Sequence, residues 1–440
     1  MSIRLKSFSF FQILFLFLAY TALYFIKNDL LLLSFFYYSL LLSFLTFYQF
    51  LNKLLLNNLL VYLLIFLFLY GIFNATIEYV LESEISKNTY YATLIYASII
   101  PSFLLGFSIQ NISIIRPKPL NFPAYKITFY NPLCSIILFS LIIFKSLYFY
   151  KLGILLNPSV LKSTNRLDLF DDFGQIQIVS SFLISSIFLY FIFNYSLIPR
   201  FYKISAAVLL IYYISIQLSV GNRKEFVGII LGIFWVIVDR KKYNFSLMKF
   251  LLILIAIFLF LVLGSIRANL SIDSNSNDIN SILISTLTSN EFVYPFETLK
   301  ISIQNYFNGS LNLLYGLSVF LYPLIIFLPR ILFPFKFESL AVTFVKTNFG
   351  GGMGYAYSPV TESFINFGVF GPAIVFFIIG LILTKITQKK DQKFTFLLFT
   401  LVPDFCRGEF STSFYQLFFQ SLFLIVLPLI FKGILSKSSI

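Results

Sequence analysis

The stretch that decides the fold spans residues 350–372 and reads GGGMGYAYSPVTESFINFGVFGP. It combines a glycine cluster, one acid and an Asn-Phe-Gly turn, and a long apolar run follows it directly. So many glycines and polar residues suit neither an ordinary helix nor direct contact with lipid. Irregular backbone at membrane level is tolerated only where protein or a water-filled cavity covers it. The stretch therefore indicates a covered site in a membrane protein.

The composition of the chain is that of a membrane protein. Of its 440 residues, 59% are hydrophobic and only 11% are charged, whereas soluble domains carry about 25% charged residues. The chain has no His, the residue that most often serves as a general base or a metal ligand. Its two cysteines, Cys134 and Cys406, predict no disulfide framework. Chemistry in this protein must therefore use carboxylates, cations, tyrosines or backbone groups.

The apolar runs predict the fold class. A spanning helix needs about 20 apolar residues. We therefore predict an all-α polytopic membrane protein with about 12 transmembrane helices, which form a single integral membrane domain over residues 1–440. The runs at 224–239 and 394–405 are the weakest, because they are short or include polar residues. The predicted spans cover residues 9–26, 30–50, 54–73, 90–109, 127–149, 174–196, 204–220, 224–239, 248–266, 366–384, 394–405 and 410–431.

The charged residues predict how these spans are oriented. With both termini in the cytoplasm, 18 of the 32 Lys and Arg residues fall in inner loops, in agreement with the positive-inside rule. All acids except Asp239 and Asp391 then lie outside. The largest outer loop covers residues 267–365 and contains the apolar stretch Leu317–Leu328. We expect that stretch to be a re-entrant or interfacial helix, because a full span would place the Lys-rich segment 385–393 outside.

Isolated cations lie at the outer ends of the predicted helices. A single Arg there is typically an interfacial anchor, but several Arg around one cavity would suit a diphosphate, because a guanidinium group binds phosphate with a planar fork. The hairpin GNRKE at 221–225 is the strongest case, since two cations in so short an outer loop oppose the positive-inside rule. The candidate phosphate-binding residues are Arg166, Arg223, Lys224, Arg267, Arg330 and Arg407.

Glu362 is the candidate acid of the site. It lies in SPVTESFINFG, where Ser358 and Pro359 predict the start of a helix. Two interpretations are open: the carboxylate accepts a proton from a sugar hydroxyl, or it stabilises the dipole at the helix start. The preceding glycines, including Gly352, would either let the backbone approach a ligand closely or form a flexible loop. Tyr355 stands beside them as a further candidate contact.

Several familiar catalytic motifs are absent from the sequence. It contains no P-loop, no HExxH, no CxxC and no Gly-x-Ser-x-Gly elbow. Asp171 and Asp172 form an acid pair, but on the outer side, where nucleotide sugars are not available. A sugar donor used on that side must be linked to lipid. Asp404, Arg407 and Glu409 are close enough in sequence to pair with one another instead of acting on a ligand.

Three motifs resemble those of the Wzy-type O-antigen polymerases, the oligosaccharide repeat-unit polymerase family. GNRKEFV at 221–227 resembles the family's Gly-x-Arg hairpin. LPRILFPFKFESL at 328–340 resembles its Pro-Arg-x-x-x-Pro-x-Lys segment, although Phe337 stands where proline is usual. GGGMGYAYSPVTESFINFGVFG at 350–371 resembles its glycine-rich run with a Glu and an Asn-Phe-Gly turn. The number of helices and the large late outer loop extend the resemblance to the whole chain.

The resemblance implies a function. Proteins of this family join repeat units carried on undecaprenyl diphosphate, at the outer face of the bacterial inner membrane. The implied reaction is a glycosyl transfer with diphosphate as the leaving group, without a metal, another cofactor or a nucleic acid. Arg223, Arg267 and Arg330 would contact the diphosphate, and Glu362 would act as a base or position the acceptor. Arg166 and Arg407 are weaker candidates for the diphosphate contact, and a chain-length regulator is an implied partner.

Other functions remain open at this point. The related O-antigen ligases usually carry a His in a late outer loop, which this chain lacks. A transporter or flippase of lipid-linked sugars would carry charged residues in the middle of its helices. Here Lys145 is the main residue of that kind, near the outer end of its run. A structural subunit of an envelope complex is a further alternative.

Overall fold

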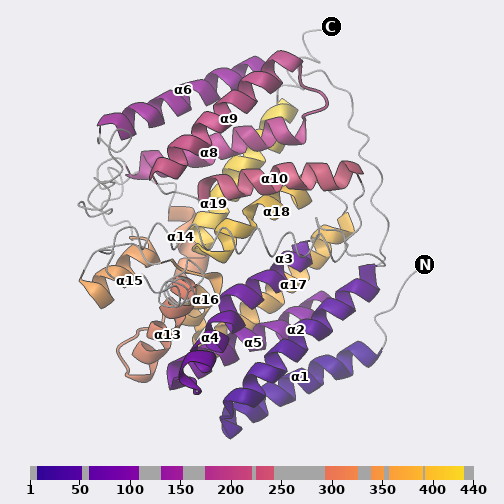
Figure 1. Ribbon diagram of the computed structural model, residues 1–440, viewed down its shortest axis with the longest axis vertical. Coiled ribbons are helices and arrows are strands. Elements are labelled where there is room, and N and C mark those ends of the chain that lie inside the picture. The colour runs from indigo at the N-terminus through magenta and orange to yellow at the C-terminus, as the bar shows by residue number, and fades with distance from the viewer. Residues whose placement is uncertain are drawn as a thin grey trace, which may run out of the picture.

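The protein is helical throughout the part that the structure describes. A computed structural model describes residues 7–51, 59–108, 130–151, 174–220, 224–241, 293–325, 338–350, 356–389 and 392–430. Within these residues every regular element is a helix (Figure 1). This confirms the predicted all-α class.

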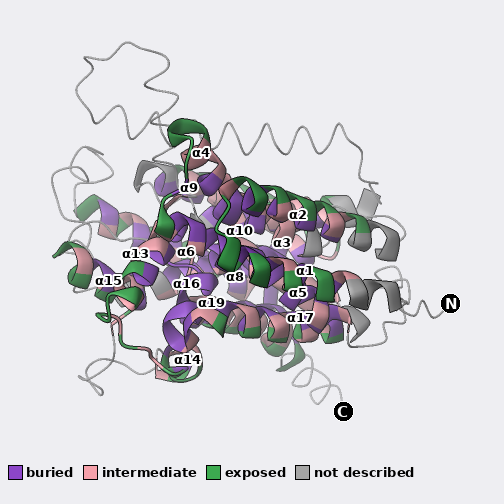
Figure 2. Cartoon of the chain, turned by 90° about the horizontal axis from the view of Figure 1, so that it is seen from below, coloured by how far each residue is buried: buried purple, intermediate pink, exposed green. Residues whose placement is uncertain are grey.

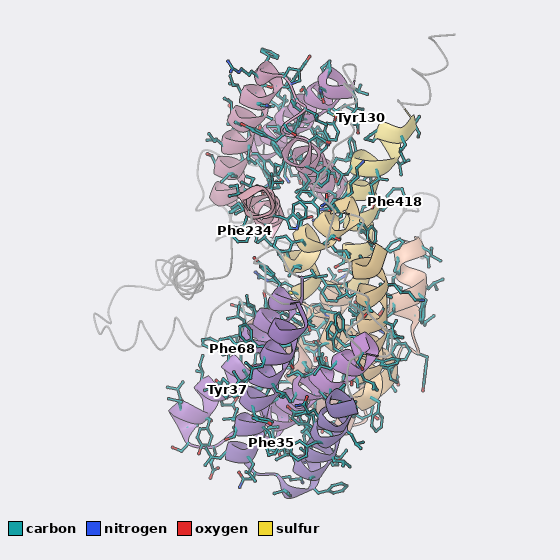
Figure 3. The ribbon with its side chains drawn as sticks, turned by 90° about the vertical axis from the view of Figure 1, so that its right-hand side faces the viewer. Phe35, Tyr37, Phe68, Tyr130, Phe234 and Phe418 are labelled. Atoms are coloured by element: carbon teal, nitrogen blue, oxygen red, sulfur yellow. The ribbon has the colours of Figure 1, made fainter. Side chains whose placement is uncertain are left out.

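The first helical bundle contains the described helices of residues 7–108 and one late helix (Figure 1). Its core includes Leu16, Phe36, Tyr96 and Phe376, all of which are buried. The aromatic rings of Tyr37 and Phe68, on adjacent elements, have centroids 6.4 Å apart (Figure 3). The elements are α1 (Ser7–Ile26), α2 (Asp29–Leu51), α3 (Leu59–Leu67), the π-helix η1 (Phe68–Ile72), α4 (Phe73–Glu82), α5 (Lys87–Ser108) and α17 (Gly371–Lys389).

The second helical bundle lies above the first in Figure 1. Its core includes Phe188, Tyr213 and Trp235. Tyr130 donates a hydrogen bond of 3.0 Å from its hydroxyl to the carbonyl of Phe423, which joins the first and last helices of this bundle. The elements are α6 (Tyr130–Lys151), α8 (Gly174–Phe193), α9 (Arg200–Val220), α10 (Lys224–Lys241), α18 (Gln392–Cys406), α19 (Phe410–Ser421) and the π-helix η5 (Leu422–Val426).

Short helices gather at one end of the two bundles. Figures 1 and 2 both show α13 and α15 at this end, whereas α1 begins at the opposite end. The short elements are α13 (Val293–Phe307), η3 (Leu317–Leu321, a π-helix), α14 (Tyr322–Ile325), α15 (Leu340–Phe349), α16 (Pro359–Phe367) and the 3-10 turn η4 (Gly368–Phe370). All of them belong to the predicted outer loop or to the start of the span that follows it.

Five helices in the described residues are long and apolar enough to cross a membrane. The total of about 12 spans remains a prediction, and the expected span 248–266 lies outside the described residues. One expectation needs adjustment: the span expected to end at residue 73 is followed by helix α4, which continues to Glu82. The five helices are Tyr62–Glu82, Lys87–Ser108, Tyr130–Lys151, Pro359–Ile386 and Phe410–Ile430.

Large apolar side chains are exposed along the long helices. Phe25 is 80% exposed, Phe201 73% and Ile211 68%. A soluble monomer rarely shows extensive apolar surface of this kind. Acyl chains would cover it in a bilayer, so the exposed faces agree with the membrane composition.

Glycines bring α5 and α17 into close contact. A Cβ atom added to Gly106 would lie 2.1 Å from the carbonyl oxygen of Phe377. One added to Gly380 would lie 2.5 Å from the carbonyl oxygen of Phe103. Small residues at helix contacts let backbones approach closely in membranes. This contact holds α17, and therefore α16 just before it, firmly against the first bundle.

The apolar stretch Leu317–Leu328 is described as far as Ile325. It forms the π-helix η3 and then the short helix α14. Both elements contact α19, and η3 also contacts α16. The described part is too short to cross a membrane. Its re-entrant or interfacial nature remains a prediction.

Candidate functional site

The start of α16 holds the candidate acid. Ser358 is the N-cap residue, and its hydroxyl accepts a hydrogen bond of 3.2 Å from the amide of Thr361. Pro359 occupies the first helical position, where its missing N–H costs nothing. Glu362 stands at the end of the first turn. The predicted helix start is confirmed.

The carboxylate of Glu362 is fully buried, and both of its oxygens accept hydrogen bonds. The hydroxyl of Ser318, in η3, donates to Oε1 over 2.6 Å. The backbone amide of Phe410, the first residue of α19, donates to Oε2 over 2.6 Å. Both bonds lie at the short end of the range for protein hydrogen bonds. Glu362 therefore joins α16, η3 and α19.

Asn366 reinforces the same junction. Its amide nitrogen donates to the hydroxyl of Ser318 over 2.6 Å and to the carbonyl of Glu362 over 2.7 Å. Its own carbonyl accepts a hydrogen bond of 3.0 Å from the amide of Tyr315. Gly368 then leaves the helix with φ +69°, a conformation that favours glycine. The predicted Asn-Phe-Gly turn therefore forms the break between α16 and α17.

Glu409 connects a fourth segment to this junction. It is the N-cap residue of α19 and only 4% exposed. Its Oε1 accepts a hydrogen bond of 2.8 Å from the amide of Ala341, in the first turn of α15. Its Oε2 accepts a longer bond of 3.4 Å from the hydroxyl of Ser411. Because Glu409 directly precedes Phe410, the contacts of Glu362 and Glu409 form one connected network, which we call the glutamate network.

Burial and the two carboxylates of the glutamate network raise the pKa of two nearby tyrosines. Burial raises the pKa of Tyr357, and the charges of Glu409 and Glu362 raise it further. The same causes, in the same order, raise the pKa of Tyr322. Both phenols therefore stay neutral at physiological pH. They can donate hydrogen bonds, but they are poor bases.

A lysine and two glutamates connect α13 to the first bundle. Lys300 lies 2.9 Å from Glu297 and 3.4 Å from Glu78, measured between nitrogen and oxygen. Burial works against the charged form of Lys300, but Glu297 and Glu78 outweigh it and raise the pKa of the amine. Glu78 also accepts hydrogen bonds from the amide of Ser86 (2.8 Å) and the hydroxyl of Thr89 (2.5 Å). Lys300, Glu297 and Glu78 thus all have partners within the protein, so we interpret these three residues as structural.

Of the predicted site residues, the structure describes the surroundings of Glu362 and Arg407. Arg407 follows α18, is partly buried, and stands three residues before Phe410 of the glutamate network. Lys224 is the first residue of α10, as expected for a helix that opens after the hairpin. The remaining predicted residues lie outside the described residues: Arg166, Arg223, Arg267, Arg330, Gly352 and Tyr355.

The network also contains residues that the sequence analysis missed. Ser318 carried no signal, because a serine in an apolar run is common and its partner lies 44 residues away. Glu409 was expected only to pair with Asp404 and Arg407, and its bond to Ala341 spans 68 residues. A usable signal for Glu409 is its position just before a helix start, where an acid favours the N-terminus.

A family model for the O-antigen polysaccharide polymerase Wzy matches residues 7–438, nearly the whole chain. The chain belongs to the O-antigen polymerase Wzy family. The curated proteins and the solved structures that were compared show no match. As a Wzy polymerase, the protein is an integral membrane enzyme that links O-antigen repeat units carried on lipid. The family assignment favours polymerisation over the ligase, transporter and structural alternatives.

Proposed function

We propose that this Wzy polymerase transfers a growing chain from undecaprenyl diphosphate onto an incoming repeat unit that is itself linked to undecaprenyl diphosphate. The acceptor hydroxyl oxygen bonds to the anomeric carbon of the chain, and the bond from that carbon to the diphosphate oxygen breaks. The diphosphate leaves with the bonding electron pair, and the hydroxyl proton passes to solvent. In this mechanism protein cations, rather than a metal, stabilise the charge of the leaving group.

The proposed leaving-group site is built from arginines. Arg223, Arg267 and Arg330 contact the diphosphate, because guanidinium groups bind phosphate oxygens in pairs and keep their charge at every physiological pH. Lys224, Arg166 and Arg407 are weaker contacts. Gly352 and Tyr355 approach the sugars of the acceptor. The support for these roles is the chemistry of the residues and their placement in predicted outer segments.

The observation that carries the proposal is the glutamate network. A general base must reach the proton that it removes, whereas Glu362 is fully buried and both of its oxygens already accept hydrogen bonds. We therefore assign Glu362 a positioning role. It holds the segments that flank the proposed site, and its role in proton transfer is the less favoured alternative.

The network fixes the chain on either side of the predicted contact residues. The segment with Arg330 follows η3 and α14, where Ser318 binds Glu362, and precedes α15, where Ala341 binds Glu409. The segment with Gly352 and Tyr355 ends at Ala356, whose carbonyl accepts a hydrogen bond of 2.9 Å from the hydroxyl of Thr298. Fixed flanking residues reduce the entropy lost when a ligand binds between them.

We place the site at the periplasmic face of the bacterial inner membrane, with both termini in the cytoplasm. The distribution of Lys and Arg supports this orientation. In Figure 1, α1 begins and α17 ends on the side of the bundles away from α13 and α15, as this orientation requires. A chain-length regulator is a proposed partner at the periplasmic face.

Reconstitution tests the proposal directly. The full-length protein in nanodiscs, supplied with undecaprenyl-diphosphate-linked repeat units, should produce a ladder of polymer and release undecaprenyl diphosphate, with or without EDTA. Loss of activity in EDTA that Mg²⁺ restores would overturn the metal-independent step. In cells, deletion of the gene should reduce the surface polysaccharide to core plus one repeat unit. Accumulation of lipid-linked polymer in the deletion strain would instead indicate a ligase.

A further inference from the structure

A buried lysine lies inside the second bundle and is not part of the glutamate network. Lys145 of α6 is 1% exposed and belongs to one of the helices long enough to span a membrane. Its ammonium group donates a hydrogen bond to the hydroxyl of Ser181 in α8. The same nitrogen lies 5.5 Å from the centre of the Tyr213 ring in α9. Ionisable residues within spanning helices are costly and mark functional sites by default.

Two glutamines extend this group by one helical turn. Gln177 precedes Ser181 by four residues, and Gln217 follows Tyr213 by four, so each shares a helix face with a residue that contacts Lys145. Gln177 is 4% exposed, and Gln217 is fully buried. We call these five residues the lysine–glutamine cluster: Lys145, Gln177, Ser181, Tyr213 and Gln217.

The cluster lies near one end of its three helices. Lys145 stands six residues before the end of α6 at Lys151, or about 9 Å along the helix. Gln177 stands three residues after the start of α8, and Gln217 three residues before the end of α9. In the proposed orientation these helix ends face the periplasm. The hairpin with Arg223 follows α9 directly in the sequence.

The amide group of Gln177 is buried and unsatisfied within the part of the chain that the structure describes. Neither its amide nitrogen nor its amide oxygen has a hydrogen-bond partner among the described residues. A buried polar group without a partner is unfavourable, and a leucine of similar size would avoid that cost. An incoming molecule with both acceptors and donors would satisfy the amide. A phosphate ester next to a sugar has that combination of groups.

We propose that the lysine–glutamine cluster binds the phosphate-linked sugar of a lipid-borne substrate. The Lys145 ammonium and the amide nitrogen of Gln177 donate to phosphate oxygens, and the amide oxygen of Gln177 accepts from a sugar hydroxyl. Exposed apolar side chains on the same helices, including Leu147 and Ile211, provide a surface for the lipid tail. This inference rests on the proposed function and adds a substrate subsite within the membrane domain.

Binding of undecaprenyl diphosphate to the full-length protein in phosphatidylethanolamine nanodiscs tests the subsite. Lys145→Gln should weaken binding about tenfold, since it removes a charge-assisted bond to phosphate. The control Lys151→Gln, on an exposed residue of the same helix, should change binding less than about twofold. Equal loss in the two variants would show a general charge effect and overturn the subsite. If phosphatidylglycerol competes as well as undecaprenyl diphosphate, the site binds phospholipid, which overturns the substrate assignment.

Gln177→Leu provides a second test that does not depend on Lys145. A purely structural glutamine without partners should be replaced with unchanged binding and activity, which would overturn the proposal. A ligand contact should give the same or a higher unfolding temperature together with a KM raised about fivefold and a similar kcat. Normal binding and polymerisation in both variants would refute the subsite alone. A wild-type protein that binds substrate but forms no polymer would refute the proposed function instead.

Discussion

The Oε2 atom of Glu362 lies 2.6 Å from the backbone nitrogen of Phe410, 48 residues later in the chain. Phe410 is the first residue of α19, so its N–H has no partner within that helix. A carboxylate satisfies this donor and interacts favourably with the positive end of the helix dipole. Because the other oxygen accepts from Ser318, one side chain sets the relative position of three helices.

Replacement of Glu362 should therefore lower the stability of the protein more directly than it affects the glycosyl transfer. Glu362→Ala leaves two buried donors without acceptors, each at a cost of about 1–3 kcal/mol. We expect a lower unfolding temperature, less protein in the membrane and no polymer. Glu362→Gln keeps the shape and one acceptor, so it should retain a ladder of polymer with reduced stability. Thermal unfolding in detergent and a polysaccharide gel measure the two effects.

The outcome for Glu362→Gln separates a positioning role from a catalytic one. A variant with wild-type unfolding temperature and no polymer would show that the carboxylate acts in proton transfer. Glu338→Gln is a suitable control, since the Glu338 side chain is 39% exposed and pairs with the exposed Lys346 at 2.6 Å. Surface pairs contribute about 0–1 kcal/mol, so this control should match the wild type in both measurements.

The predicted phosphate contacts can be tested one at a time. Arg223→Ala and Arg330→Ala should each abolish polymer while the protein remains in the membrane, because each removes charge that stabilises the leaving diphosphate. Losses of about 100-fold or more in turnover are typical when such a group is removed. Lys346→Ala, which removes an exposed cation of α15, serves as the control. Wild-type chain lengths in both Arg variants would contradict the assignment.

The close contact between α5 and α17 predicts that one added methyl group will lower the stability of the protein. In Gly380→Ala the new Cβ would lie 2.5 Å from the carbonyl oxygen of Phe103. Relieving this clash requires a shift of the helix backbone, which is unfavourable. We expect a loss of about 1–3 kcal/mol in the free energy of unfolding. In Gly71→Ala the nearest atoms belong to the Tyr96 side chain at 3.1 Å, so the loss should be smaller. Equal unfolding temperatures for Gly380→Ala and the wild type would argue against this helix contact.

Cysteine accessibility tests the orientation. The native Cys134 and Cys406 are both buried, so they give little background. Ser310→Cys, in the exposed turn after α13, should react with a membrane-impermeant maleimide in intact spheroplasts. Ser196→Cys, in the exposed turn between α8 and α9, should react only after the membrane is opened. The reverse pattern would invert the topology and move the proposed site to the cytoplasm.

Local patterns in the sequence predicted much of the helical framework. The run of apolar residues in α1, the Ser358-Pro359 start of α16 and the Asn-Phe-Gly turn at residues 366–368 were all recognisable. Each depends on interactions between near neighbours in the chain, such as capping bonds and backbone conformation. The extension of α4 to Glu82 was not anticipated, because its polar residues resemble a loop until their tertiary contacts are known.

The sequence by itself determined that the protein is a helical membrane protein, because hydrophobicity and charge are properties of the residues and the bilayer acts on them directly. The family motifs lie in its sequence as well. Only the tertiary structure decided which polar residues meet. Glu362 reaches Phe410, Glu409 reaches Ala341, and Lys145 reaches Ser181 across 36 to 68 residues. Such partners depend on how helices pack, and no local pattern of apolar and polar residues encodes that choice.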